Sequence, residues 1–137
     1  MKGGYVLAIQ ATLRDTDALG HVNNAVYVNW FEEVRTRYVC DRRGIKDIAQ
    51  VDFVLAATTI HFRSPVYMHE TIDMRCAPVR IGPTSWDLAY EGRAADGGRL
   101  VVEGTSTQVQ YDYEARAKAP IPAEWRALLQ ADLVIER

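Results

Sequence analysis

The sequence lacks the features on which several large protein classes depend. Of its 137 residues only two are cysteines, Cys40 and Cys76, and neither belongs to a CxxC motif, which argues against a disulfide framework, a zinc site or a redox site. Sixteen basic and eighteen acidic residues give a net charge of −2 with no Lys/Arg run, so no nucleic-acid partner is expected. No apolar run reaches the length of about 18 residues that spans a bilayer. We therefore expect a cytoplasmic protein without a membrane partner.

The sequence also lacks the motifs of the common nucleophilic hydrolases. No GxSxG motif is present, and Cys40 falls in the middle of an expected helix without a partner nearby. His61 and His69 have no further metal ligand at a suitable spacing, so no metal is expected. A hydrolytic reaction would then need a carboxylate as its activated oxygen.

One long amphipathic helix is predicted in the first third of the chain. A first strand is expected over residues 4–13, and a polar segment, residues 14–24, separates it from a helix of about 18 to 20 residues. The stripe that predicts the helix consists of Tyr27, Trp30, Phe31, Val34 and Tyr38. Asn23 or Asn24 is the predicted N-cap, and Gly44 is the predicted stop.

From residue 51 onward the hydrophobic period changes to two, which predicts four consecutive strands. They are expected in VLAATTIHFRSPV, TIDMRCAPV, SWDLAYEGR and RLVVEGTSTQVQYDY, and a short helix is expected from Pro122. We interpret the first of these strands as buried by the helix on one side. Hairpin connections make the sheet antiparallel, so residues 1–137 are predicted to form a single α+β domain with the long helix on the concave face. Apolar side chains on the other sheet face predict self-association.

The polar segment before the helix contains more polar groups than a helix cap requires. These groups are Asp15, Asp17, His21, Asn23 and Asn24. Aspartates before a helix are commonly turn residues. Alternatively, Gly20 lets the chain turn so that Asp17 faces the helix start, where free N–H groups and the helix dipole stabilise negative charge. Asp15 is the more structural of the two aspartates.

The stretch DTDALGHVNNAVYVNWFEEVR resembles the hotdog-fold acyl-CoA thioesterases, in particular the 4-hydroxybenzoyl-CoA thioesterase-like branch with its Asp-x-Asp-x-x-Gly-His-Val-Asn-Asn signature. The similarity continues in HFRSPVYMHETIDM, VRIGPTSWDLAYE and APIPAEWRALL. His69 departs from the family, in which many relatives carry glycine before an acidic residue. The resemblance implies a hotdog fold and hydrolysis of an acyl thioester to a free acid and coenzyme A. It also implies a homodimer or homotetramer with sites at the subunit interface.

Carried over to this sequence, the resemblance makes Asp17 the catalytic carboxylate, as nucleophile or as general base. It places the oxyanion donor at the backbone N–H near Asn24. His21 orients the loop, hydrogen-bonds the substrate carbonyl or satisfies backbone groups. Asn23 caps the helix, and alternatively its amide holds Asp17 or the substrate.

The same resemblance suggests which residues contact the substrate. Tyr27, Trp30 and Phe31 are core residues first, next to or lining an acyl pocket. The segment that contains Arg80, Gly82 and Ser85 would contact the coenzyme A portion from the partner subunit. No cofactor is expected, because coenzyme A is part of the substrate.

Other functions remain open on the sequence. An acyl-carrier protein could replace coenzyme A, with Arg35, Arg37, Arg42 and Arg43 as its docking patch. A non-hydrolytic acyl-thioester binding module is a second alternative, although such a module would have lost its carboxylate. A hotdog dehydratase fits the loop less well. Glu32 and Glu33 are reserve catalytic candidates, and their simpler role is pairing with Arg35, Thr36 or Arg37.

Overall fold

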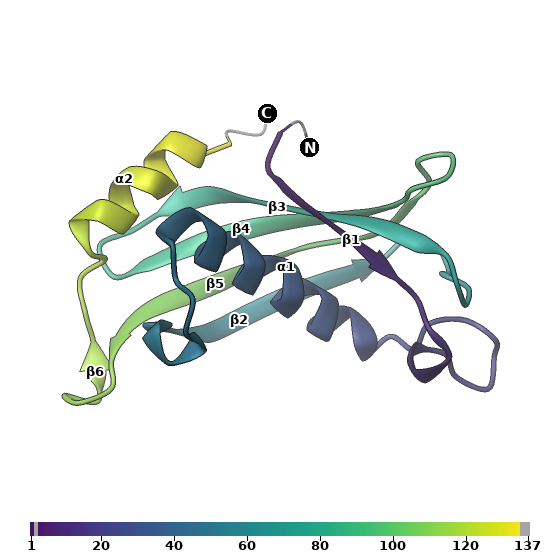
Figure 1. Cartoon of the computed structure of the whole chain (residues 1–137), viewed down its shortest axis with the longest axis horizontal. Helices are drawn as coiled ribbons and strands as arrows, with labels where there is room; N and C mark the ends of the chain where they lie inside the picture. Colours follow the sequence, from purple (N-terminus) through teal and green to yellow (C-terminus); the bar gives the residue numbers. More distant parts are fainter. Residues whose placement is uncertain (2, 135–137) are drawn as a thin grey trace.

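An antiparallel sheet curls around one long helix in the computed structural model, which describes residues 1 and 3–134 (Figure 1). The elements follow in the order β1 (Tyr5–Gln10), α1 (Val26–Arg43), β2 (Phe53–Phe62), β3 (Thr71–Ile81), β4 (Ser85–Ala94), β5 (Leu100–Asp112), β6 (Ala117–Lys118) and α2 (Ala123–Asp132). Short 3-10 turns lie at Leu13–Asp15 and Ile48–Gln50. The strand and helix order predicted from hydrophobic periodicity is confirmed. The two 3-10 turns and the two-residue β6 were not predicted.

The strands are arranged in the order β1-β3-β4-β5-β2, every pair is antiparallel, and β6 pairs with β5. β2 is therefore an edge strand, and most of its side chains are exposed. The prediction that the helix buries β2 is wrong, because α1 makes its main sheet contacts with β1 and β3, which lie toward the opposite edge of the sheet. Part of the inner face of β2 is left open beside the helix.

The core lies between α1 and the inner faces of β3 and β4. All five predicted stripe residues of α1 are buried. So are the inward residues of the two strands, Ile72, Met74 and Cys76 on β3 and Trp86, Leu88 and Tyr90 on β4. Phe31 stacks on Tyr90 with ring centroids 4.1 Å apart. The outward residues of β4 alternate with these and are mostly polar, so the expected apolar outer face is not present on this strand.

The two ends of α1 differ in how well the sequence predicts them. Gly44 ends the helix with φ +68°, as expected. The predicted asparagine N-cap is wrong, because Ala25 occupies the cap position without a side-chain cap. The Oδ1 atom of Asn23 instead accepts the Ala25 N–H at 2.9 Å, which forms an Asx turn just before the cap.

Gly104 allows β5 to approach β2 and the helix at the same time. A Cβ atom at this position would overlap the Thr59 carbonyl oxygen and lie 2.9 Å from the ring of Phe31. We expect Gly104→Ala to lower the free energy of unfolding by about 1–3 kcal/mol, the usual cost of overpacking. Urea unfolding measures this, with Thr105→Ala on the exposed side of β5 as the control. Equal stability of the two variants would contradict the prediction.

Candidate active site

A tight hairpin orders the polar segment before α1. The Asn23 N–H donates to the Asp15 carbonyl oxygen at 2.8 Å, and the Asp17 N–H donates to the His21 carbonyl oxygen at 3.0 Å. The loop is closed by Gly20, whose N–H donates to the Asp17 carbonyl oxygen at 3.0 Å and whose φ is +83°. This left-handed conformation is one that glycine adopts without steric cost. The predicted turn at Gly20 is confirmed, and it brings Asp17 opposite His21.

The two aspartates of the hairpin have different surroundings. Asp15 accepts the Thr12 N–H at 2.8 Å and the Thr12 hydroxyl at 3.2 Å, which fits the structural role expected for it. Asp17 is half-buried, and its Oδ1 accepts the Leu19 N–H at 2.8 Å. Within residues 1 and 3–134, no group donates a hydrogen bond to its second oxygen, Oδ2. Asp17 thus holds the turn with one oxygen and keeps the other free.

The start of α1 provides a free hydrogen-bond donor. Asn23 satisfies two backbone donors, since its side chain accepts the Ala25 N–H and its carbonyl oxygen accepts the Val26 N–H at 2.9 Å. The N–H of Asn24 has no acceptor in the described part of the chain. This donor lies at the positive end of the helix dipole, where an anion is stabilised.

A cavity of about 240 Å³ lies beside the start of the helix. It is lined by His21, Val22, Asn24, Tyr27, Phe62, Arg63, Ser64 and Pro65. Tyr27 packs edge-on against Phe62, with ring centroids 5.4 Å apart, and forms an aromatic floor. Burial raises the pKa of Tyr27 to about 12, so its phenol stays protonated near neutral pH and is not a base. The lining suits a substrate with an apolar part and a carbonyl group.

The predicted site residues divide into those that meet at this cavity and those that do not. His21, Asn24 and Tyr27 line it. Asp17 is not a lining residue, and its backbone N–H bonds to the His21 carbonyl oxygen across the hairpin. Trp30 and Phe31 are buried in the core and are not among the lining residues, although Trp30 packs against Tyr27 at 5.1 Å. The opposite wall of the cavity, residues 62–65, was not predicted as part of the site. The only signal was its presence in the family-like stretch HFRSPVYMHETIDM.

The model of the thioesterase-like superfamily matches residues 11–129. The chain belongs to this superfamily. No match was found among curated proteins. The match covers the hairpin, α1 and all strands from β2 to β6, and therefore the whole candidate site.

Solved structures of thioesterases share this fold. A predicted thioesterase from Bacillus stearothermophilus is 21% identical, with a TM-score of 0.89 over 97% of this chain and 98% of the other. A thioesterase from Thermus thermophilus in complex with coenzyme A and zinc is 26% identical, with a TM-score of 0.84 over 96% of both chains. A 1,4-dihydroxy-2-naphthoyl-CoA thioesterase from Synechocystis is 21% identical, with a TM-score of 0.81 over 93% and 96%. The predicted hotdog fold is confirmed.

The β3–β4 hairpin lies near α2, at the end of the sheet away from the start of α1 (Figure 1). It contains Arg80, Gly82 and Ser85. Arg80 donates to both carboxylate oxygens of Asp87, at 2.7 and 2.9 Å, and to the Ser85 hydroxyl at 2.9 Å. These contacts hold the pKa of Asp87 below its ordinary value, mainly through the Arg80 hydrogen bond. A single chain does not bring these residues to Asp17. Contact with coenzyme A from a partner subunit stays a prediction.

The arginines considered as a carrier-docking patch are mostly engaged. Arg35 is buried and donates to the Tyr90 hydroxyl at 3.1 Å. Arg42 pairs with Asp132 and Arg43 with Asp52, both at 2.7 Å. The pairing of Glu32 or Glu33 with Arg35 or Arg37 is not observed in the described residues. No continuous free basic patch results on this helix.

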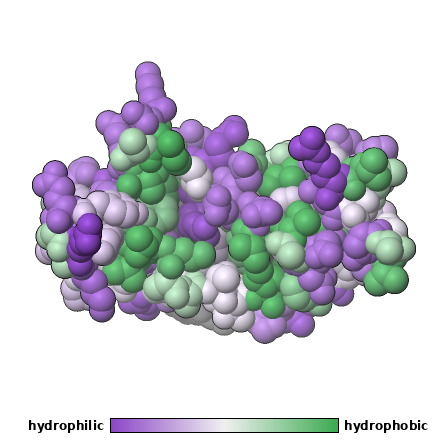
Figure 2. Space-filling view, turned by 90° about the horizontal axis from the view of Figure 1, so that it is seen from below, coloured by the Kyte–Doolittle hydropathy of each residue, from purple (hydrophilic) through white to green (hydrophobic). Residues whose placement is uncertain are grey.

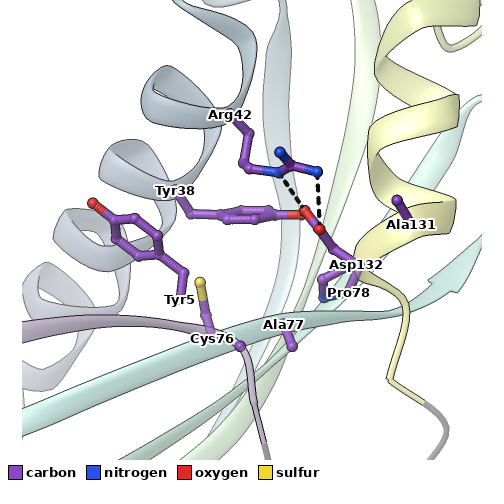
Figure 3. Close-up of a pocket in the computed structure, with 9 residues that line it drawn as sticks. Tyr5, Tyr38, Arg42, Cys76, Ala77, Pro78, Ala131 and Asp132 are labelled. Atoms are coloured by element: carbon purple, nitrogen blue, oxygen red, sulfur yellow. Dashed lines mark hydrogen bonds and ion pairs between the residues drawn. The ribbon is translucent and has the colours of Figure 1, made fainter.

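A second cavity, of about 480 Å³, lies near the other end of α1 (Figure 3). Its polar centre is Asp132 at the end of α2, which accepts the Tyr38 hydroxyl at 2.8 Å and two Arg42 donors at 2.7 and 3.0 Å. Burial, reinforced by Asp132, raises the pKa of Tyr38 well above its ordinary value. Burial also raises the pKa of the Cys76 thiol to about 12, so this thiol is not a nucleophile. The contacts anchor α2 rather than form a reactive centre.

Residues 1 and 3–134 contain neither a candidate membrane-spanning helix nor a candidate metal site. No helix there combines the length and the hydrophobicity needed to cross a membrane. The same residues contain no group of three or more His, Cys, Asp or Glu side chains that could hold a metal ion. The polar groups at the start of α1 therefore remain the strongest candidates for chemistry.

Proposed function

We propose that the protein hydrolyses an acyl thioester of coenzyme A to the free acid and coenzyme A. One observation carries this proposal. The free Asn24 N–H lies at a cavity whose wall includes His21, and the backbone of His21 pairs across the hairpin with that of Asp17, whose carboxylate keeps an unbonded oxygen. A base or nucleophile and an oxyanion donor are the two groups that thioester hydrolysis requires. The superfamily membership supports the same reaction class.

In the proposed reaction, the free oxygen of Asp17 attacks the thioester carbon or removes a proton from an attacking water. The carbonyl oxygen gains negative charge, and the Asn24 N–H and the positive end of α1 stabilise it. The C–S bond then breaks, and coenzyme A leaves as a thiolate. If Asp17 is the nucleophile, a water molecule then hydrolyses the acyl–Asp17 anhydride to the free acid and restores the carboxylate. If Asp17 is the base, the acid forms directly, and the proton on Asp17 passes to the thiolate or to solvent. Base catalysis is worth about 10²–10⁴-fold and one oxyanion donor about 10²–10³-fold, so these two groups supply a large part of the rate.

His21 and Asn23 have supporting roles in this proposal. His21 lines the cavity, and its Nδ1 contacts the Val22 carbonyl oxygen at 3.4 Å, which leaves Nε2 as the ring nitrogen for the substrate carbonyl. Asn23 keeps its amide oxygen on the Ala25 N–H and so shapes the turn that leaves the Asn24 N–H free. Tyr27 and Phe62 supply the apolar surface for the acyl group.

Release of free thiol from a panel of aliphatic and aromatic acyl-CoAs tests this function. Thiol release from the same acyl groups attached to an acyl-carrier protein, measured in parallel, shows which of the two carriers the enzyme prefers. Faster release from the coenzyme A esters supports the proposal, and exclusive release from the carrier protein favours the first alternative. Tight binding of an acyl-CoA without release of thiol would favour a binding module.

We also propose that two copies associate along the exposed edge of β2. The edge presents unpaired backbone groups over the length of the strand. Leu55 and Phe62 on this strand are 41% and 49% exposed. Figure 2, which views the molecule from below and so toward β2, shows several apolar patches on this face. Association along β2 would cover these apolar patches. It would also bring the β3–β4 hairpin that contains Arg80 in one copy toward the candidate active site of the other.

We expect Leu55→Lys to reduce the oligomer to a monomer, because it places a charge at a buried interface. Light scattering during gel filtration measures the mass. Leu133→Lys, at an exposed position beyond α2, is the matched control and is expected to leave the mass unchanged. A monomeric wild type, or an unchanged oligomer in the Leu55 variant, would contradict association through β2.

A further inference from the structure

One side chain joins both ends of the segment between β2 and β3 that forms the far wall of the cavity. Arg99, which directly precedes β5, donates to the Glu70 carboxylate oxygens at 2.9 and 3.0 Å. The same guanidinium donates to the Pro65 carbonyl oxygen at 3.0 Å and to the Ser64 hydroxyl at 3.2 Å. We call this set of contacts the Arg99 clamp.

The clamped segment also holds the hairpin that carries Asp17. The Val66 carbonyl oxygen accepts the Val22 N–H at 2.7 Å, and Tyr67 forms a β-bridge with His21. Glu70 extends the clamp to this bridge, because its carboxylate accepts the Tyr67 N–H at 2.9 Å. A continuous set of hydrogen bonds thus leads from Arg99 through the wall to the hairpin.

The charges of the clamp persist at neutral pH. Burial alone would raise the pKa of Glu70, but hydrogen bonds from Arg99 and from the Tyr67 N–H outweigh it and hold the pKa below its ordinary value. The pair is partly exposed, with 42% of the Arg99 side chain and 26% of the Glu70 side chain open to solvent. Such a pair adds little to global stability. Its geometry is nevertheless specific, because the planar guanidinium holds Nη2 against Glu70 and Pro65 while its Nε reaches the Ser64 hydroxyl.

Backbone strain within the same segment indicates that its conformation is imposed from outside. His69 has φ +74°, in the left-handed region that a side chain with a Cβ adopts at a cost. Its N–H donates to the Ala11 carbonyl oxygen at 2.7 Å, and the Glu70 N–H that follows donates to the Tyr67 carbonyl oxygen at 3.1 Å. Strain of this kind persists only where surrounding contacts determine the conformation.

We propose that Arg99 is a positioning residue for the hydrolytic site, which it serves by fixing residues 64–70 and, through Val66 and Tyr67, the hairpin that carries Asp17. The proposal rests on the proposed function for its kinetic part only. A small displacement of reacting groups lowers the rate of the chemical step, with losses that reach about 10²-fold for a 1 Å shift. Among the residues that line the cavity, Arg99 hydrogen-bonds only to Ser64 and Pro65, and it takes no part in proton transfer.

We expect Arg99→Ala to lower kcat by about 10-fold or more while KM changes much less, since positioning acts on the chemical step. Arg99→Lys should recover only part of the loss, because lysine has a single nitrogen and cannot reproduce the arrangement in which Nε binds Ser64 while Nη2 binds Glu70. Amide hydrogen exchange of the full-length protein, followed by NMR, should show faster exchange at Val22 in Arg99→Ala and unchanged exchange in β4. Glu70→Gln, which keeps an acceptor, should give a smaller change in the same direction.

Arg93→Ala is the matched control, since Arg93 lies in the same β4–β5 region and pairs with Glu91 at 2.7 Å without contacting residues 64–70. Its kcat and Val22 exchange should match wild type. The inference is overturned if Val22 exchange is unchanged in Arg99→Ala, or if Arg93→Ala causes the same loss. If wild type hydrolyses no thioester, the proposed function fails, and Val22 exchange still decides whether the clamp holds the hairpin. If Arg99→Ala does not fold, kcat and Val22 exchange are measured on Glu70→Gln instead, and wild-type values of both would overturn the inference.

Discussion

Asp17→Asn is expected to lower kcat for acyl-CoA hydrolysis by at least ~10²-fold while the protein stays folded. Asparagine keeps a side-chain oxygen that can accept the Leu19 N–H, so the hairpin turn should persist. It removes the negative charge and the basicity of the free oxygen, which the proposed reaction needs. Steady-state thiol release measures kcat, and circular dichroism with urea unfolding measures the fold.

Asp47→Asn is the control for the loss of a turn carboxylate. Asp47 accepts the Ala49 N–H at 2.9 Å, the same contact two residues ahead that Asp17 makes, but it lies beyond the far end of α1. Its kcat should equal that of wild type. An Asp17→Asn enzyme as fast as wild type would show that the carboxylate is a turn residue only. Glu32→Gln and Glu33→Gln on α1 would then test the reserve candidates.

The second large effect is expected from removing the backbone N–H at Asn24. Asn24→Pro deletes this donor and should lower kcat by about 10²–10³-fold, the range measured for single oxyanion donors. Proline is compatible with the position, because it lies just before the helix and Asn-Pro pairs favour turns. Asn24→Ala keeps the N–H and should retain most of the activity, which separates the backbone donor from the side chain.

Two measurements distinguish loss of the Asn24 N–H from a general effect of the proline on folding or substrate binding. Urea unfolding should show that Asn24→Pro keeps a stability close to that of Asn24→Ala. The KM of both variants should remain similar, since an oxyanion donor acts mainly on the transition state. Wild-type kcat in Asn24→Pro, or an equal loss in both variants, would place the oxyanion donor elsewhere.

Periodic patterns explain which parts of the fold the sequence predicts correctly. The stripe of α1 and the alternation on β3 and β4 depend on local spacing, so the buried faces could be assigned without coordinates. The position of β2 could not, because an apolar strand has the same composition whether it lies at the centre of a sheet or at its edge. The N-cap was misplaced because Asn23 can cap a helix or form an Asx turn, and the choice depends on the backbone just before it.

The candidate site divides in the same way. The hairpin that carries Asp17 follows from the left-handed turn at Gly20. Both residues belong to the stretch DTDALGHVNN, so the sequence alone indicates the turn. The opposite wall reaches the cavity only through the tertiary fold, since α1, the loop after it and β2 all lie between Asn24 and Phe62 along the chain. The Arg99 clamp connects segments separated by 29 and 34 residues, and no pattern in the sequence links them.

A crystal structure with a non-hydrolysable ketone analogue of an acyl-CoA, in which CH₂ replaces the thioester sulfur, shows directly whether Asp17 and the Asn24 N–H face the substrate carbonyl. We expect the analogue's carbonyl oxygen at about 2.9 Å from the Asn24 nitrogen. We also expect an Asp17 oxygen within about 3.5 Å of the carbonyl carbon, or of a water poised beside it. A carbonyl bound to other donors, or an Asp17 carboxylate directed into bulk solvent in the complex, would contradict the account.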